Sequence, residues 1–321
     1  GGHEFQRWNR PRRNPHVSRC VRPPTAGAAA KEDSVGQLPL LISRHPVSWF
    51  LLLTFVISWL LVVWISLGRA GLLSYEPSIL WLALVGQFGP SLAAVIVVAA
   101  HSGRSGVKEL LQGLRRWRLG ARSWIVIALF IPVSFALGYV VHLALGGDRL
   151  SGGALLNPTF AGTLLGGSVV GLVFGGLSEE LGWRGFLLPH LQDRMASLQA
   201  SLIVALVWSL WHLEPDYLVA GFRDGWAAFF EPWRTYMFQF VMEAVPLTLI
   251  MTALWNRTGG SLFSAVVIHS VTNAFISAIP EEWRPLAPTL KWSLIGFEWV
   301  FALSAVWWLG EKQRMLRGPG R

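Results

Sequence analysis

The chain has 321 residues, of which 53% are hydrophobic and 14% are charged, and its mean hydropathy is +0.46. A soluble domain carries about 25% charged residues. The composition therefore excludes an ordinary soluble protein and indicates a polytopic helical membrane protein. The net charge is +9, but the basic residues cluster between hydrophobic segments, which indicates membrane topology rather than nucleic-acid binding. The single cysteine, Cys20, excludes an internal disulfide and a cysteine-based zinc site within one chain.

The N-terminal 40 residues are polar, basic and rich in Pro, Ala and Gly. They lack the apolar core of a cleavable signal peptide. We expect residues 1–40 to be a disordered basic cytoplasmic tail. Residues 41–312 then form the membrane domain, and residues 313–321 form a cytoplasmic C-terminal tail.

The apolar stretches predict an all-α polytopic membrane bundle of eight transmembrane helices with the active site inside the bundle. The expected spans are 47–67, 79–100, 123–145, 161–188, 198–213, 236–255, 260–279 and 291–309. The fourth is expected to continue past an acidic pair to Leu188, where Pro189 ends it. The basic amphipathic segment 106–118 is expected to lie on the cytoplasmic interface.

The Lys and Arg residues predict the orientation. With the N-terminus inside, 21 of them lie on the inner side and six on the outer side. This asymmetry predicts that both termini are cytoplasmic. Arg outnumbers Lys, which is typical of a GC-rich genome, and we expect the plasma (inner) membrane of a bacterium.

The first polar motif is Glu179-Glu180-x-x-x-Arg184, inside an apolar run. Charges at membrane depth are costly, about 2.5–3.5 kcal/mol each. Helical neighbours point about 100° apart, so the two carboxylates cannot share a face. Arg184 lies four residues after Glu180, the spacing of an ion pair, which leaves Glu179 to face the bundle interior as a general base. A paired network that only joins helices is the alternative.

Two later spans each carry a histidine. Trp208 precedes His212 by four residues and is expected to pack on the same face. His269 and Asn273 have the same spacing, so imidazole and carboxamide share one face. Either motif alone also fits a buried polar residue or a hydrogen bond between helices. Glu243 and Glu298 fall within expected spans without a matching motif, and they could line a cavity or pair across helices.

Together these motifs resemble the CAAX prenyl protease type II and bacteriocin-processing (CPBP, Abi) family of intramembrane proteases. That family is marked by Glu-Glu-x-x-x-Arg, Phe-x-x-x-His and His-x-x-x-Asn (or Asp). This chain carries all three, with Trp208 in place of Phe. The resemblance implies an endopeptidase that cleaves a membrane-associated protein or peptide, including a prenylated CAAX-type protein, and no nucleic-acid partner.

By this resemblance Glu179, helped by His212, activates a water, and His269 and Asn273 stabilise the oxyanion. Glu180, Arg184 and Trp208 support them. Glu179, His212 and His269 also have the composition of a Glu/His/His zinc site, so a divalent metal, zinc first, is a second expectation. Two other functions stay open: a non-enzymatic scaffold or bacteriocin self-immunity protein of the same fold, and a proton-coupled transporter. The absence of detectable repeats argues against the transporter.

Overall fold

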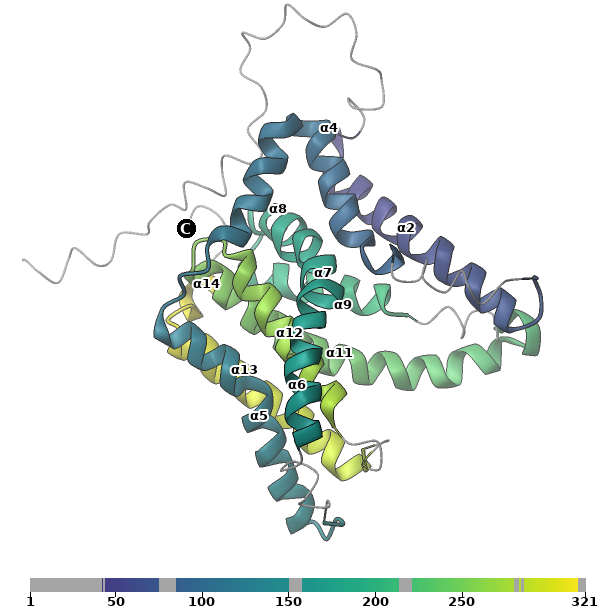
Figure 1. Cartoon of the computed structure of the whole chain (residues 1–321), viewed down its shortest axis with the longest axis vertical. Helices are drawn as coiled ribbons and strands as arrows, with labels where there is room; N and C mark the ends of the chain where they lie inside the picture. The colour runs from purple at the N-terminus through teal and green to yellow at the C-terminus, as the bar shows by residue number, and fades with distance from the viewer. Residues whose placement is uncertain are drawn as a thin grey trace, which may run out of the picture.

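The computed structural model describes residues 42, 44–74, 85–149, 158–213, 221–279, 283 and 286–316. Every regular element among these residues is helical, which confirms the all-α prediction (Figure 1). The helices are α2 (Pro46–Arg69), α4 (Gly89–Gln112), α5 (Ala121–Ala144), α6 (Pro158–Gly171), α7 (Ser178–Gly182), α8 (Leu188–Gln192), α9 (Ser197–Trp211), α11 (Trp226–Arg257), α12 (Leu262–Ala278), α13 (Pro288–Trp308) and α14 (Lys312–Leu316). A short 3-10 helix, η2 (Gly113–Arg115), and two π-helical segments, η3 (Leu172–Leu177) and η4 (Trp183–Leu187), connect some of them.

Each of the eight expected spans corresponds to helical structure among the described residues. Four helical segments are long and apolar enough to cross a membrane: 46–68, 121–144, 158–192 and 288–308. Two others, α9 and α12, are apolar but shorter. The expected N-terminal tail, part of the second span and the last five residues lie outside the described residues.

The basic segment 106–118 begins in the bent end of α4 and continues through η2. Gly103 has φ 61° and ψ −157°, so the helix changes direction there before it continues to Gln112. Glycine adopts this positive φ without a steric penalty. The bend separates the apolar first half of α4 from the basic half that was expected on the cytoplasmic interface.

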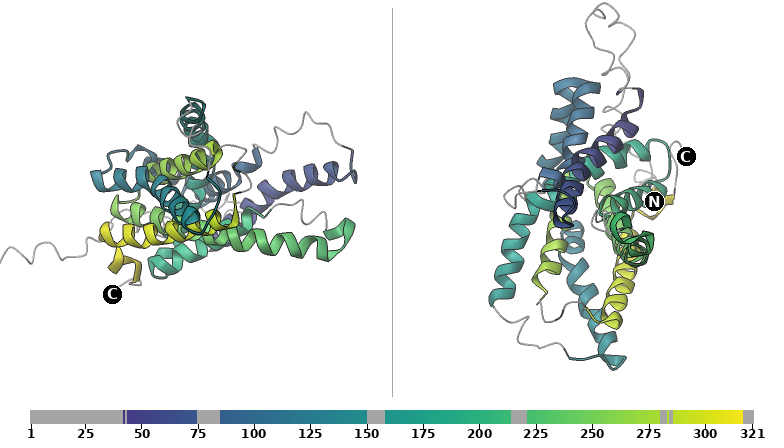
Figure 2. Two further views of the ribbon diagram at one scale, coloured as in Figure 1. Left: turned by 90° about the horizontal axis from the view of Figure 1, so that it is seen from below. Right: turned by 90° about the vertical axis from the view of Figure 1, so that its right-hand side faces the viewer.

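The bundle is built from adjacent helix pairs. The closest partners are α5 with α13, α6 with α12, α2 with α4, and α9 with α11. Figure 2 shows α6 at the edge of the bundle, and Gly171 is its one buried residue. Small residues allow the backbones to approach: a Cβ added to Gly182 would lie 2.6 Å from the backbone of Pro90. Such contacts are typical of helices packed in a membrane.

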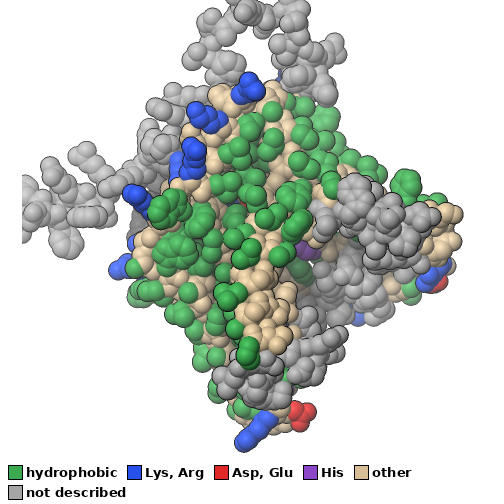
Figure 3. Space-filling model, viewed as in Figure 1, with side chains coloured by type: hydrophobic (Ala, Val, Ile, Leu, Met, Phe, Trp, Pro, Cys, Tyr) green, Lys and Arg blue, Asp and Glu red, His purple; other side chains and the backbone are tan. Residues whose placement is uncertain are grey.

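Large apolar side chains cover much of the outer surface. Leu165 and Val169 on α6 and Trp307 on α13 are each about 70% exposed. Figure 3 shows apolar side chains across the middle of one face, with Lys and Arg gathered toward its edges. A surface of this kind fits a hydrocarbon environment with charged ends in water.

The fourth membrane segment runs from Pro158 to Gln192 and is broken inside. It continues beyond the acidic pair, as predicted. The expectation that Pro189 ends it is wrong, because the helix runs on to Gln192 with Pro189 in the first turn of α8. The wider π-helical turn η4 lies just before it, and a proline at a helix start requires no N–H partner.

Candidate active site

The two glutamates follow a break in the fourth membrane segment. Phe174 (φ −98°, ψ 68°) and Gly175 (φ 156°, ψ −75°) leave helical geometry. The Gly175 N–H donates to Ser178 Oγ (2.9 Å), and α7 begins at Ser178. Glu179 and Glu180 therefore lie in the first turn of a restarted helix, with the backbone break one turn before them.

Glu180 belongs to a fully buried charged network. Arg184 Nη1 donates to both carboxylate oxygens of Glu180, at 2.9 and 3.0 Å, and Arg184 Nη2 donates to Thr248 Oγ1 on α11 at 3.0 Å. Neither charged side chain has exposed surface. The predicted pair of Glu180 and Arg184 is confirmed, and its charges compensate each other where neither side chain reaches the surface.

His269 on α12 lies between the two carboxylates. A hydrogen bond joins its Nδ1 to Glu180 Oε1 (2.7 Å), and its Nε2 lies 4.0 Å from Glu179 Oε1. A carboxylate on Nδ1 fixes the orientation of an imidazole and directs its second nitrogen. Glu180 therefore does more than pair with Arg184, because it also turns His269 toward Glu179.

Glu179 is held by two tryptophans. Trp208 Nε1 on α9 donates to Glu179 Oε2 at 2.6 Å, and Trp183 Nε1 donates to the same oxygen at 3.3 Å. Glu179 is 6% exposed. Burial of this group is tolerable because its charge is hydrogen-bonded. Glu179 faces the interior as predicted, with Oε2 anchored and Oε1 toward His269.

His212 ends α9 beside this cluster. Its Nδ1 is hydrogen-bonded to the Trp208 carbonyl oxygen (3.0 Å), and its ring packs on Trp208 and Phe240 with centroids 5.3 and 4.6 Å apart. The expected packing of His212 and Trp208 on the same face is therefore confirmed, with the two rings edge to face. His212 also lies within electrostatic range of Glu179 and His269.

Asn273 lies one turn after His269, on the same face of α12, as predicted. A Cβ added to Gly175 would lie 3.2 Å from Asn273 Nδ2 and 3.9 Å from His269 Nε2. The amide and the imidazole therefore converge on the break in the fourth segment. Asn273 is exposed, so this side of the cluster is accessible from outside the bundle.

The expected zinc ligands are close to each other but do not form a ligand set as they are arranged. Among the described residues, no three His, Cys, Asp or Glu side chains are placed to hold a metal ion. Glu179 Oε2 and His269 Nδ1 are occupied by Trp208 and Glu180. A metal site here would need at least one of the three side chains to move.

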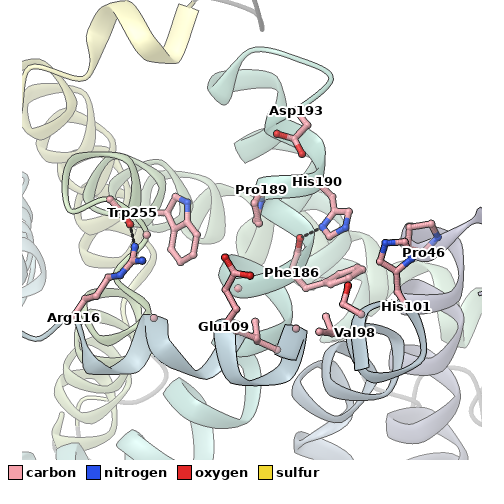
Figure 4. A pocket seen from close by; sticks show the side chains of 17 residues that line it. Pro46, Val98, His101, Glu109, Arg116, Phe186, Pro189, His190, Asp193 and Trp255 are labelled. Atoms are coloured by element: carbon pink, nitrogen blue, oxygen red, sulfur yellow. Dashed lines mark hydrogen bonds between the residues drawn. The ribbon is translucent and has the colours of Figure 1, made fainter. Parts of the chain in front are cut away.

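A separate pocket lies between the bent end of α4 and α8 (Figure 4). Its lining includes His101, Glu109, Phe186, His190 and Asp193, and it shares no residue with the cluster around Glu179. His190 Nδ1 is hydrogen-bonded to the Phe186 carbonyl oxygen (2.7 Å). Burial raises the pKa of Asp193, and the neighbouring Arg194 opposes this shift.

Three contributors to the site are not apparent from the motifs. Trp183 carries a weak signal, since it lies four residues after Glu179. Thr248 is 64 residues from Arg184 and lies in an apolar helix like many other threonines. Gly175 adjoins Gly176, but nothing in the sequence distinguishes this glycine pair as the break.

Two comparisons bear on this arrangement. The profile of the family described as "Type II CAAX prenyl endopeptidase Rce1-like" matches residues 161–275. A protein of Methanococcus maripaludis named "CAAX prenyl protease 2" is 24% identical over 230 residues, which cover 70% of this chain and 81% of that protein. The profile match includes the broken fourth segment, α9 and the His269 to Asn273 motif, and these carry every catalytic residue predicted from the sequence.

Proposed function

The chain belongs to the type II CAAX prenyl endopeptidase family and is a CAAX-type intramembrane endopeptidase, and we propose that Glu179 is its general base. The observation that carries the proposal is the state of the Glu179 carboxylate. It is buried in an apolar bundle, its Oε2 is anchored, and its Oε1 lies 4.0 Å from His269 Nε2. A gap of this size between two polar atoms suits a bridging water.

In the proposed reaction Glu179, assisted by His212, takes a proton from this water as the oxygen attacks the scissile carbonyl carbon. The carbonyl oxygen becomes an oxyanion, which His269 Nε2–H and Asn273 Nδ2 stabilise by donation. Donation from both ring nitrogens, from Nδ1 to Glu180 and from Nε2 to the oxyanion, requires His269 in its protonated form. The C–N bond then breaks, and the proton on Glu179 passes to the leaving nitrogen. The products are a carboxylic acid and an amine, and the acid proton then passes to the amine to give a carboxylate and an ammonium.

The convergence of Asn273 and His269 on the backbone break supports this assignment of roles. Gly175 has no side chain, so a substrate carbonyl can approach both donors there. Donors that are fixed before the substrate binds stabilise a developing charge without reorganisation. Glu180 and Arg184 keep His269 in position and take no part in proton transfer.

The proposed substrate is a membrane-associated protein or peptide. The relative from M. maripaludis is named a prenyl protease, which makes a prenylated CAAX peptide the first substrate to test. Purified protein in nanodiscs is incubated with a prenylated CAAX peptide, the same peptide without the prenyl group, and a membrane-tethered peptide library. Cleavage by the wild type that is lost in Glu179→Ala supports the enzyme. Binding without cleavage in both would favour the scaffold function.

A divalent metal is a separate proposal. The same assay with 1,10-phenanthroline tests it, followed by addition of zinc. Loss of cleavage and its recovery with zinc would support a ligand set made from Glu179, His212 and His269. Cleavage that persists in chelator while Glu179→Ala is inactive would support a glutamate mechanism without metal.

We also propose that both termini face the cytoplasm of a bacterial inner membrane. Cys20 is the single cysteine and lies in the N-terminal segment. A membrane-impermeant maleimide should therefore label it in lysed cells and not in intact cells. Labelling in intact cells would contradict this orientation.

A further inference from the structure

We infer that Trp208 is a positioning residue for the general base, and that its indole N–H holds the Glu179 carboxylate in the orientation that activates water. This inference rests on the proposed function of Glu179. It concerns one interaction that the family motif does not contain, because Phe, the residue of the motif at this position, has no donor.

One oxygen of the Glu179 carboxylate, Oε2, accepts a short hydrogen bond from Trp208. The distance from Trp208 Nε1 to Glu179 Oε2 is 2.6 Å, against 3.3 Å from Trp183 Nε1. Among the described residues, no hydrogen bond reaches Oε1, which lies 4.0 Å from His269 Nε2. An anchored Oε2 prevents rotation of the carboxylate, so Oε1 stays directed at the place where water must bind.

The indole ring is itself fixed from several sides. The Arg184 guanidinium carbon lies 5.1 Å from the ring centroid, and the His212 and His269 rings lie at 5.3 Å. Trp208 is 4% exposed. A ring held by these contacts has one orientation, so its N–H direction is fixed as well. The packing of Trp208 on α9 therefore also fixes the orientation of the Glu179 carboxylate on α7.

A charge-assisted hydrogen bond is stronger than a neutral one, and carboxylate orientation determines the efficiency of a general base. The effect should appear in turnover rather than in substrate binding, because Trp208 contacts the base and not the proposed substrate path along Gly175 and Asn273. Substitution of a residue that only fills space would not lower kcat while leaving KM nearly unchanged.

The test measures kcat and KM for a membrane-tethered peptide with wild type, Glu179→Gln, Trp208→Phe and Trp255→Phe in nanodiscs. Trp255 is a matched control, since it is 7% exposed and its buried Nε1 has no hydrogen-bond partner among the described residues. Trp208→Phe should lower kcat about 10- to 100-fold and change KM less than about threefold. Trp255→Phe should leave both constants near the wild-type values.

A kcat for Trp208→Phe within twofold of the control, with Glu179→Gln inactive, would overturn the inference and leave the proposed function intact. Full activity of Glu179→Gln would instead show that Glu179 is not the general base, and the inference about Trp208 would then fail as well. If Trp208→Phe does not fold, Trp208 is replaced by benzothienylalanine, which keeps the ring shape and has sulfur in place of N–H. The same loss of kcat is then expected, and an unchanged kcat refutes the positioning role.

Discussion

Among the described residues we compare two groups of side chains that are centred on glutamates and lie between helices, because their surroundings differ. The Glu179 cluster (Glu179, Glu180, Arg184, Trp208 and His269) is nearly closed to solvent, and each carboxylate has several partners. The α11–α13 group (Glu243, Lys291 and Glu298) has one ion pair of 3.6 Å, and both of its side chains are about one third exposed.

Glu298 in the α11–α13 group is 4% exposed, and its Oε2 has no hydrogen-bond partner among the described residues. No histidine or amide accompanies it in the interactions described. Within the described part of the chain, Glu298 is therefore as buried as Glu179 but lacks the hydrogen-bond donors that hold the Glu179 carboxylate. The difference lies in the number of fixed donors around the carboxylate, and single substitutions can measure it.

The largest difference is expected when the carboxylate is replaced without a change of shape. Glu179→Gln removes the proposed general base, and cleavage should fall about 10²- to 10⁴-fold. Glu298→Gln is the matched control, since it changes a carboxylate of similar burial, and its activity should stay near the wild-type level. Peptide cleavage in nanodiscs measures both. Equal losses in the two variants would mean that the α11–α13 group also takes part in catalysis.

Stability should separate the two groups as well. Glu180→Ala leaves the Arg184 charge buried without its main partner, and this should lower the free energy of unfolding by about 3–5 kcal/mol. Glu243→Ala breaks the longer, partly exposed pair with Lys291, and the expected loss is about 1 kcal/mol or less. Thermal unfolding in detergent compares the variants, and a Glu243→Ala loss as large as that of Glu180→Ala would contradict the comparison.

The part of the cluster that follows helical periodicity was predictable. The pair of Glu180 and Arg184, the packing of Trp208 on His212, and the shared face of His269 and Asn273 all follow from a spacing of four residues. Such spacings are local, so they do not depend on how the rest of the bundle packs. The lengths of the apolar runs likewise predicted helices in all eight expected spans.

Contacts between distant segments were not predictable in the same way. The hydrogen bond from Trp208 to Glu179 joins residues 29 positions apart, and it depends on how α9 rotates against α7. The backbone break at Gly175 depends on the close packing of η3 against α12. The sequence motifs identify which side chains are present, whereas rotation and packing decide which atoms meet.

The backbone break provides a smaller test of the Glu179 cluster. Gly175→Ala places a Cβ 3.2 Å from Asn273 Nδ2 and in a φ of 156° that side chains rarely adopt. We expect kcat/KM to fall about 10-fold or more, because the proposed oxyanion donors are displaced. Gly166→Ala on α6 is the control, since its added Cβ meets no atom within 4 Å, and its activity should be unchanged. A fully active Gly175→Ala would show that the backbone break is not needed for substrate binding.

The smallest expected effect on catalysis concerns α11, which contributes to both groups through Thr248 and Glu243. Thr248→Val keeps the side-chain shape and removes the oxygen that accepts from Arg184 Nη2. One buried donor of a charged group is then unsatisfied, so the free energy of unfolding should fall by about 1–3 kcal/mol. Thr248→Ser restores the acceptor and should recover most of this loss. Because Arg184 keeps both hydrogen bonds to Glu180, His269 should stay oriented, and kcat of the folded fraction should change little. If Thr248→Val lowered kcat as strongly as Trp208→Phe, α11 would act on catalysis through Arg184, and the active cluster would extend into the helix that carries Glu243.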